Sequence, residues 1–561
     1  DDLWLKEGFA EFMAYKTLEK VLPEYNAWKA FYERNKPLAY LTDSTRGTTP
    51  IYQEIPNLSA AKSAYGNIVY RKAPAFLKQA EFYFGEDRFQ TAVRAFLKKH
   101  EFANAEWTDL VTEFAEIETA ELKTRDYYQK IFTVEERKAA ELSTKNETNG
   151  WANSWVKKRG VFKFHLQIEP FGDDEVKGGD VIEPKYRTDF PENSNVILLS
   201  KFKILIIYKD GTRKVESLET LPNESPNPGA LATKEIAAII PNYQDYGYGI
   251  FLLDPKSRDY VLKNIQNEKD AFLRSMMWGA LWDSVREAEL NPKDYVALAI
   301  KNISAETDEL TIQTILGRVG TAMNYYLSET EAKQLAPQLE KVLLEKITNA
   351  ETAGQRITFY RAFLNVASSA DARQKLKDVL NGKFEIRDLK LKTKDKFDIV
   401  TKLLILNDPD APKLLDDLRK IETSDEAKRY AYAAGAGFPT KEMKQSYFND
   451  FLNNKEISES WIESASTSFN STRHADLTLP YLEKALAELP KLKQNRKIFF
   501  VNNWLSAFIG GQKSEQALAI VNKFLADNSN LDRDLRLKIL EVGDNLERAV
   551  KIRKQFADKQ N

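Results

Sequence analysis

The sequence contains no cysteine, so disulfide bonds, thiolate metal sites and cysteine nucleophiles are all excluded. A chain without cysteine is compatible with oxidising and reducing compartments alike, so cytoplasm and periplasm both stay open. Histidine is almost as rare, with only His100, His165 and His474. None of them has a partner at the spacing of an H-E-x-x-H helix, which supplies two imidazole ligands to zinc.

Net charge is nearly absent as well, because 82 lysine and arginine residues face 83 aspartate and glutamate residues. Nucleic-acid binding needs a cationic footprint, so this balance argues against nucleic acid as a partner. Apolar runs of about 18 residues or more are also missing, and the best candidate, 197–208, is interrupted by Lys201 and Lys203. The sequence therefore predicts no transmembrane segment and has the composition of a soluble globular protein.

What is present is a chain of 561 residues whose periodicity changes twice, which predicts a multidomain, mainly α protein. Residues 1–158 have helical periodicity, with the charge-rich stretch 117–150 predicted to be a surface insertion or hinge. Residues 159–254 contain alternating and β-branched segments that predict a small β-sandwich. Residues 255–561 predict helices joined by short turns, as in an α-solenoid of the HEAT or armadillo type.

Residues 1–13 predict a helix packed on a core, because four apolar side chains recur at helical spacing: Leu5, Phe9, Phe12 and Met13. Glu7 lies off that stripe, where a glutamate is most often a solvated surface residue. The segment around it, Trp-Leu-Lys-Glu-Gly-Phe-Ala, closely resembles the segment that carries the third zinc ligand in the aminopeptidase N family of gluzincin metallopeptidases. The resemblance implies that Glu7 is a zinc ligand.

A second segment, 67–73, reads Asn-Ile-Val-Tyr-Arg-Lys-Ala and resembles the Tyr-x-Lys-Gly segment of the same family. In that family the tyrosine hydroxyl donates a hydrogen bond to the oxyanion of the tetrahedral intermediate. The resemblance therefore implies that Tyr70 is catalytic, whereas without it Tyr70 would be an ordinary core residue, one of 24 tyrosines. The family usually has glycine after the lysine, whereas here Ala73 follows Lys72 and Pro74 comes next. Proline is compatible with a first helical turn.

The resemblance continues through the boundaries between the three parts of the chain. Residues 151–161 resemble the segment that leads into the family's β-sandwich, and residues 241–254 resemble the segment that leads out of it. Residues 274–283 resemble the opening helices of the family's C-terminal helical domain, and specific motifs stop near Glu306. The resemblance thus implies that residues 1–158 are the helical remainder of a thermolysin-like catalytic domain.

The function implied is that of a fragment of a zinc-dependent aminopeptidase, which removes N-terminal residues from peptide substrates. In the family, the nearer histidine of H-E-x-x-H precedes the ligand glutamate by about 19 residues, which from Glu7 falls before residue 1. We expect a missing N-terminal half of the same polypeptide to supply both histidines and the general base. Glu11 is a poor substitute base, since it has the pattern of a surface carboxylate.

One carboxylate does not hold catalytic zinc, which takes about three protein ligands and a water. The complete protein is therefore expected to bind one zinc ion, whereas this chain alone is expected to bind zinc poorly and to be inactive. The sequence assigns no residue to substrate binding. We also expect the apolar face of the first helix, including Trp4, to be exposed or the helix to fray, because the missing half would normally cover it.

Two alternatives stay open. The chain is a non-catalytic scaffold or peptide-binding protein of the same family if it has lost its metal site but kept its helical domain. It is a solenoid unrelated to peptidases if residues 1–70 match the family by chance. The reading frame upstream of Asp1 separates the enzyme from the scaffold, because only the enzyme requires an H-E-x-x-H segment there.

Overall fold

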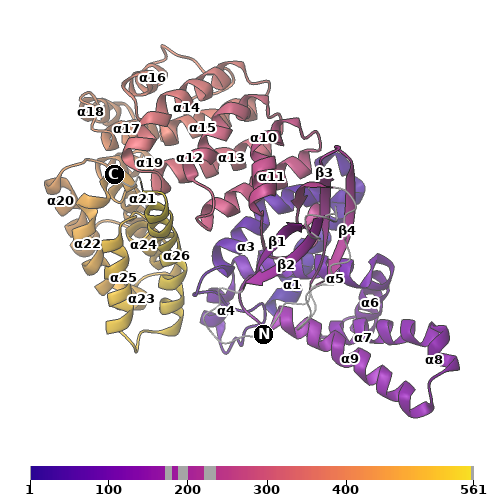
Figure 1. Ribbon diagram of the computed structural model, residues 1–561. Helices are drawn as coiled ribbons and strands as arrows, with labels where there is room; N and C mark the ends of the chain where they lie inside the picture. The colour runs from indigo at the N-terminus through magenta and orange to yellow at the C-terminus, as the bar shows by residue number, and fades with distance from the viewer. Residues whose placement is uncertain (1, 171–179, 188–199, 220–234, 558–561) are drawn as a thin grey trace. The chain divides into compact units, whose positions relative to one another are not determined.

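The computed structural model describes residues 2–170, 180–187, 200–219 and 235–557. The chain forms two compact units, Asp1–Asp283 and Ser284–Asn561, and Figure 1 shows the elements of each. The first unit begins with a helical part: α1 (Leu3–Val21), η1 (Pro23–Tyr25), α2 (Ala27–Ala30), η2 (Phe31–Asn35), α3 (Lys36–Asp43), α4 (Leu58–Ala64), η3 (Ile68–Lys72), α5 (Ala73–Phe84), α6 (Glu86–Lys99), α7 (Trp107–Thr124), α8 (Asp126–Lys130) and α9 (Val134–Val156). Two of the short turns, η2 and η3, are π-helical.

The stretch 117–150 is helical and lies largely at the surface. It contains the end of α7, the short helix α8 and most of α9, and α7 packs against α9 (Figure 1). The start of α9 is fixed by a capping box, in which Thr133 accepts a hydrogen bond from the Glu136 backbone N–H (3.2 Å) and Glu136 accepts one from the Thr133 backbone N–H (2.7 Å). The high charge content of this stretch therefore reflects the solvated faces of two regular helices.

Six strands follow in the first unit: β1 (Lys163–Pro170), β2 (Asp180–Arg187), β3 (Lys201–Tyr208), β4 (Arg213–Glu219), β5 (Ile236–Ile240) and β6 (Ile250–Leu252). They form two three-stranded sheets, ordered β2-β1-β6 and β4-β3-β5. Strand β1 pairs antiparallel with β2 and parallel with β6, whereas β3 pairs antiparallel with both of its neighbours. Both sheets contribute to one hydrophobic cluster: Phe164, Leu166, Phe202, Ile204, Ile206, Ile236, Ile239 and Phe251.

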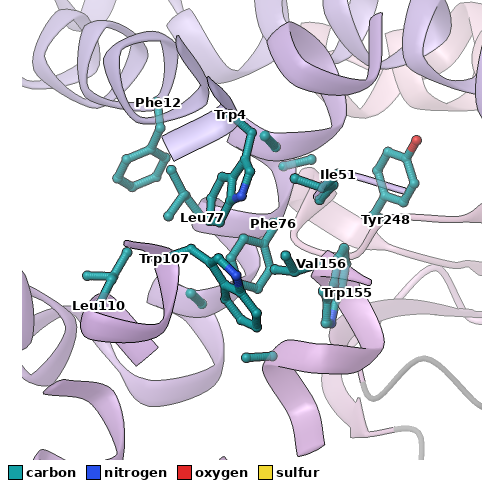
Figure 2. Packing of buried hydrophobic residues seen from close by; sticks show 14 of the residues in the cluster. Trp4, Phe12, Ile51, Phe76, Leu77, Trp107, Leu110, Trp155, Val156 and Tyr248 are labelled. Carbon is teal, nitrogen blue, oxygen red and sulfur yellow. The ribbon is translucent and has the colours of Figure 1, made fainter. Parts of the chain in front are cut away.

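The helical part of the first unit packs around a cluster of large aromatic side chains (Figure 2). Trp4 of α1 meets the ring of Phe76 of α5 edge-on, with ring centroids 5.7 Å apart, and Trp151 of α9 stacks on Phe76 at 5.2 Å. Such pairs add about 0.5–1.5 kcal/mol each beyond the burial of their area. The core therefore draws together the first helix, the helix after the Tyr70 segment and the last helix before the sheets.

The apolar face of α1 is covered within this chain, contrary to expectation. Trp4 is 1% exposed and Phe12 is 0% exposed, and α1 is regular from Leu3 onward. The buried line runs through Trp4, Gly8 and Phe12, one position away from the predicted stripe, so that Met13 is 38% exposed. The expectation of an exposed Trp4 or a frayed helix was therefore wrong, because Phe76 of α5 packs on Trp4, and Trp28 of α2 and Phe89 of α6 pack on Phe12.

The rest of the chain is helical. The first unit closes with α10 (Pro255–Asn264), η5 (Ile265–Asn267) and α11 (Ala271–Arg286), which contains the boundary between the units. The second unit contains α12 (Pro292–Asn302), η6 (Ile303–Ala305), α13 (Glu309–Thr321), η7 (Ala322–Tyr326), α14 (Glu329–Asn349), α15 (Ala353–Val366), α16 (Ala370–Leu380), α17 (Thr393–Ile405), α18 (Ala411–Ile421), α19 (Asp425–Gly435), α20 (Lys441–Asn453), α21 (Glu459–Phe469), η8 (Thr472–His474), α22 (Ala475–Ala487), α23 (Leu489–Asn495), α24 (Ile498–Phe508), α25 (Glu515–Asp527) and α26 (Arg533–Gln555). Alternate helices pack on one another: α13 on α15, α17 on α19, and α19 on α21.

One lysine of the second unit is completely buried. Lys444 of α20 is 0% exposed, and its ammonium group donates hydrogen bonds to the carbonyl oxygens of Ala436 and Phe469, both at 2.8 Å. Burial lowers the pKa of Lys444 to about 7, because a charged amine is disfavoured in the apolar interior.

This burial predicts that the second unit becomes more stable as the pH rises. Between about pH 7 and the ordinary lysine value, the unfolded chain binds a proton at Lys444 that the folded chain does not. Replacing Lys444 by methionine is expected to remove the part of this rise that Lys444 contributes, since Lys402 of the same unit also has a pKa lowered to about 7. Urea unfolding at about pH 7 and about pH 9.5 measures the change, with K420M as the exposed control. An equal rise in the free energy of unfolding for wild type and K444M would contradict the prediction.

Candidate active site

Gly8 allows α1 to approach the Tyr70 segment very closely. A Cβ atom placed on Gly8 would lie 2.6 Å from the Cβ of Ala73 and 3.3 Å from the carbonyl oxygen of Val69. Side-chain carbons do not approach one another so closely, so any larger residue would push α1 away from η3 and α5. The glycine of the Trp-Leu-Lys-Glu-Gly-Phe-Ala segment therefore has a packing role, and it brings the preceding residue, Glu7, to this crossing.

Glu7 and Tyr70 face each other across the helix crossing. The Glu7 side chain is 17% exposed, Tyr70 is half-buried on η3, and the Glu7 carboxylate lies close enough to the phenol to act on its pKa. Burial first, and then the Glu7 carboxylate, raise the pKa of Tyr70, so its hydroxyl keeps its proton at neutral pH. Glu7 and Tyr70, the two residues that the sequence singles out, are 63 positions apart in the chain (70 − 7). The structure brings them close together.

The neighbours of this pair are also paired. Arg71 Nη1 lies 3.7 Å from the Glu11 carboxylate, one helical turn beyond Glu7. The Tyr65 ring stacks on the Tyr70 ring, with centroids 6.0 Å apart, and Tyr65 is 45% exposed. This partly exposed ion pair is in keeping with the structural interpretation of Glu11.

The lysine of the Tyr-x-Lys segment points away from this pair and into the interior. Lys72 is 1% exposed, and its ammonium group lies 2.8 Å from the carboxylate of Asp43, which is 0% exposed. The same carboxylate accepts hydrogen bonds from the Thr48 hydroxyl (2.8 Å), the Gly160 backbone N–H (2.9 Å) and the Tyr248 hydroxyl (3.0 Å). Sequence analysis gave Asp43 no role, because no motif surrounds it.

This buried network fixes the segments that enter and leave the sheets. Gly160 and Tyr248 come from the two junctions, 151–161 and 241–254, that resemble the family. Lys72 also donates a hydrogen bond to the Gly160 carbonyl oxygen (3.1 Å). A fully desolvated ion pair is stable only when its remaining hydrogen-bonding groups are satisfied, and the junctions supply those partners here.

The described residues do not complete a zinc site by themselves. Over residues 2–170, 180–187, 200–219 and 235–557, no group of three or more His, Cys, Asp or Glu side chains is arranged to hold a metal ion. His100 lies at the end of α6 beside the Asn104 carbonyl (3.3 Å), His165 lies in β1, and His474 bonds to the Ile405 carbonyl (3.0 Å). Because catalytic zinc takes about three protein ligands, the residues around Glu7 alone do not fit the ion.

Comparison with known proteins matches two parts of the chain to two described families. Residues 238–548, more than half of the chain, match the family described as the ERAP1-like C-terminal domain, and residues 1–131 match the peptidase family M1 domain. Aminopeptidase N of Streptomyces lividans is similar over 100% of this chain, with 23% identity. The chain belongs to the aminopeptidase N family. The M1 aminopeptidases of this family are generally zinc-dependent peptidases.

Relatives in the aminopeptidase N family show more identity over shorter stretches. Leucyl aminopeptidase of Saccharolobus solfataricus is 33% identical over 21% of this chain and 15% of its own length. Puromycin-sensitive aminopeptidase of Caenorhabditis elegans is 35% identical over 20% of this chain and 12% of its own length. This chain spans 63% of the length of the Streptomyces lividans protein. Within the part of the chain that the structure describes, no helix combines the length and apolar character needed to cross a membrane.

Proposed function

We propose that this chain is part of a zinc-dependent aminopeptidase that removes N-terminal residues from peptides. Glu7 is a ligand of the zinc ion, and Tyr70 donates a hydrogen bond to the oxyanion that forms on the substrate carbonyl. The observation that carries the proposal is the placement of Glu7 beside Tyr70 at a helix crossing, where a Cβ on Gly8 would lie only 2.6 Å from the Cβ of Ala73. The names of the relatives, which are aminopeptidases from bacteria, archaea and animals, support the same reaction.

The two histidine ligands and the general base belong, in this proposal, to an H-E-x-x-H segment of the same polypeptide outside this sequence. Tyr70 is a proton-bearing donor at neutral pH, because burial and Glu7 raise its pKa. A pre-positioned neutral donor of this kind stabilises a developing negative charge without having to reorganise. The carboxylate of Glu7 keeps the phenol oriented in the meantime.

We also propose that the three-part division of the chain corresponds to three domains. Residues 1–158 are the helical remainder of a thermolysin-like catalytic domain, 159–254 a β-sandwich and 255–561 an α-solenoid. The hydrophobic cluster shared by the two sheets supports the sandwich, since a sandwich buries the inner faces of both sheets together. The packing of alternate helices supports the solenoid.

Metal analysis and turnover of an aminoacyl anilide test the proposed function. The isolated chain is expected to retain no stoichiometric zinc after dialysis and to show negligible turnover, because Glu7 is the only proposed ligand within it. The longer polypeptide, expressed with its upstream reading frame, is expected to bind one zinc ion and to turn over the anilide. Tight stoichiometric zinc with turnover by the isolated chain would refute the incomplete site.

A non-catalytic peptide-binding scaffold is the second candidate function. It is favoured by the lack, among the described residues, of any group of three metal-ligating side chains. The same experiment separates the two candidates, because a longer polypeptide that binds neither zinc nor turns over the anilide would support the scaffold. In that case the pairing of Glu7 with Tyr70 would have a purely structural role.

A further inference from the structure

Four cationic side chains gather in the second unit without a carboxylate partner. Lys402 lies on α17, Arg473 on η8, Lys513 just before α25 and Arg553 on α26. None of the four forms an ion pair closer than 4.0 Å with any carboxylate of the described residues. The chain carries as many acidic as basic residues, so this gathering is a local feature and does not follow from the overall charge.

Backbone carbonyl oxygens hold three of these cations in place, those of Lys402, Lys513 and Arg553. Lys402 donates a hydrogen bond to the Asn365 carbonyl (2.6 Å) and Lys513 donates one to the Asn324 carbonyl (3.4 Å). The two asparagines are joined by a hydrogen bond from the Asn324 amide to the Asn365 side-chain oxygen (3.4 Å), so both ammonium groups belong to one location.

Arg553 is tied to the same region, because its guanidinium donates a hydrogen bond to the Leu327 carbonyl at 2.6 Å, next to η7. Asn365 lies in the last turn of α15, where the helix dipole attracts cations, and Asn324 lies in η7, which continues α13. Carbonyl dipoles orient an ammonium or guanidinium group, but they do not cancel its charge.

The charges repel one another. Burial, followed by the nearby charge of Arg473, lowers the pKa of Lys402 to about 7, and only Glu340 opposes this shift. The Glu340 carboxylate is already used by the backbone N–H groups of Ser368 (2.7 Å) and Ser369 (3.1 Å). The adjacent His474 adds no charge at neutral pH, because burial lowers its pKa to about 4.

Burial also lowers the pKa values of Lys513 and Arg473. Burial, with Arg553 as the next cause, lowers the pKa of Lys513, while Glu329 and Asp476 act in the other direction. Burial also lowers the pKa of Arg473, although this side chain is exposed to solvent by its surface area. The exposed guanidinium of Arg473 gives a ligand access to this end of the cluster.

We propose that Lys402, Arg473 and Lys513 form a binding site for an oxyanion, the carboxylate or phosphate group of a small ligand. The planar guanidinium of Arg473 matches two oxygens of such a group, and the two ammonium groups add point charges. The bound oxyanion supplies the negative charge that the surrounding residues do not. The site lies in the second unit and is independent of the roles proposed for Glu7 and Tyr70.

Calorimetric titration with inorganic phosphate and, separately, with acetate tests the site. Sodium chloride keeps the ionic strength constant, so that general screening does not contribute. The chain is expected to bind one equivalent of oxyanion, and R473Q and K402M are each expected to bind at least about tenfold more weakly. K420M, which changes an exposed lysine that already pairs with Asp417, is expected to bind as the wild type does. Binding of phosphate alone indicates a phosphate ligand, and binding of acetate as well indicates a carboxylate.

Proton uptake provides a second measurement that does not depend on the variants. An oxyanion beside Lys402 restores its ordinary pKa, so binding at about pH 7.5 draws a proton from the buffer. Titrations in two buffers of different ionisation enthalpy reveal this uptake, which K402M is expected to lose. If R473Q does not fold by circular dichroism, R473K retains the charge and replaces it in the comparison. No binding of either anion above the chloride background, or equal binding by wild type and K402M, would overturn the proposal.

Discussion

The variant Y70F of the longer, zinc-containing polypeptide is expected to have a kcat about a hundred- to a thousandfold below that of the wild type. Loss of one oxyanion donor typically costs about 2.7–4 kcal/mol of transition-state stabilisation. The donor acts only when charge develops on the substrate oxygen, so kcat and kcat/KM are expected to fall together while KM changes little. The zinc content of Y70F is expected to equal that of the wild type, because the phenol is not a ligand in the proposed site.

Two further variants give this prediction its controls. Y65F removes the hydroxyl group from the ring that stacks on Tyr70, with ring centroids 6.0 Å apart. This variant is expected to retain nearly full kcat. E7Q removes the proposed zinc ligand, so it is expected to lose both zinc and activity, whereas Y70F loses activity alone. Full kcat in Y70F would show that Tyr70 contributes no hydrogen bond to the transition state, whatever the zinc content.

Local sequence patterns singled out two residues that lie near each other in the fold. Glu7 and Tyr70 were identified from two short segments, and the structure places the Glu7 carboxylate near the Tyr70 phenol; their roles stay a prediction. The register of the first helix was predicted one position out, because Gly8 on the buried face adds no apolar side chain to the periodicity. Gly8 carries no side chain for a periodicity argument, yet its contact with Ala73 sets the distance between the helices.

Features built from distant residues could not be predicted in this way. Asp43 lies 29 positions before Lys72 (72 − 43) and 205 positions before Tyr248, with no motif around it. The cations of the second unit come from four separate elements between Lys402 and Arg553, and each is unremarkable in its own segment. Their significance depends on the missing carboxylate partners, and pairing in space is not visible in a single sequence.

The buried pair of Asp43 and Lys72 predicts the largest effect on stability. The variant D43A is expected to lower the free energy of unfolding of the first unit by about 3–5 kcal/mol, because it leaves the Lys72 ammonium buried without a counter-charge. It also removes the acceptor for the Gly160 backbone N–H and the Tyr248 hydroxyl. Urea unfolding, followed by the fluorescence of the buried tryptophans of this unit, measures the change. D126A is the matched control, since Asp126 forms an exposed pair with Lys130 at 3.1 Å and is expected to cost less than about 1 kcal/mol.

The double variant D43A/K72M decides whether charge is the cause. Methionine fills much of the lysine volume without a charge, so the double variant is expected to be more stable than D43A, with a coupling free energy of about 0.5–3 kcal/mol. The double variant is expected to stay less stable than the wild type, because the hydrogen bonds that Lys72 and Asp43 make to the two junctions are lost together. If D43A/K72M were as unstable as D43A, loss of those hydrogen bonds would explain the whole effect. The lysine of the Tyr-x-Lys segment would then act by tethering the junction at Gly160, and its charge would contribute nothing to stability.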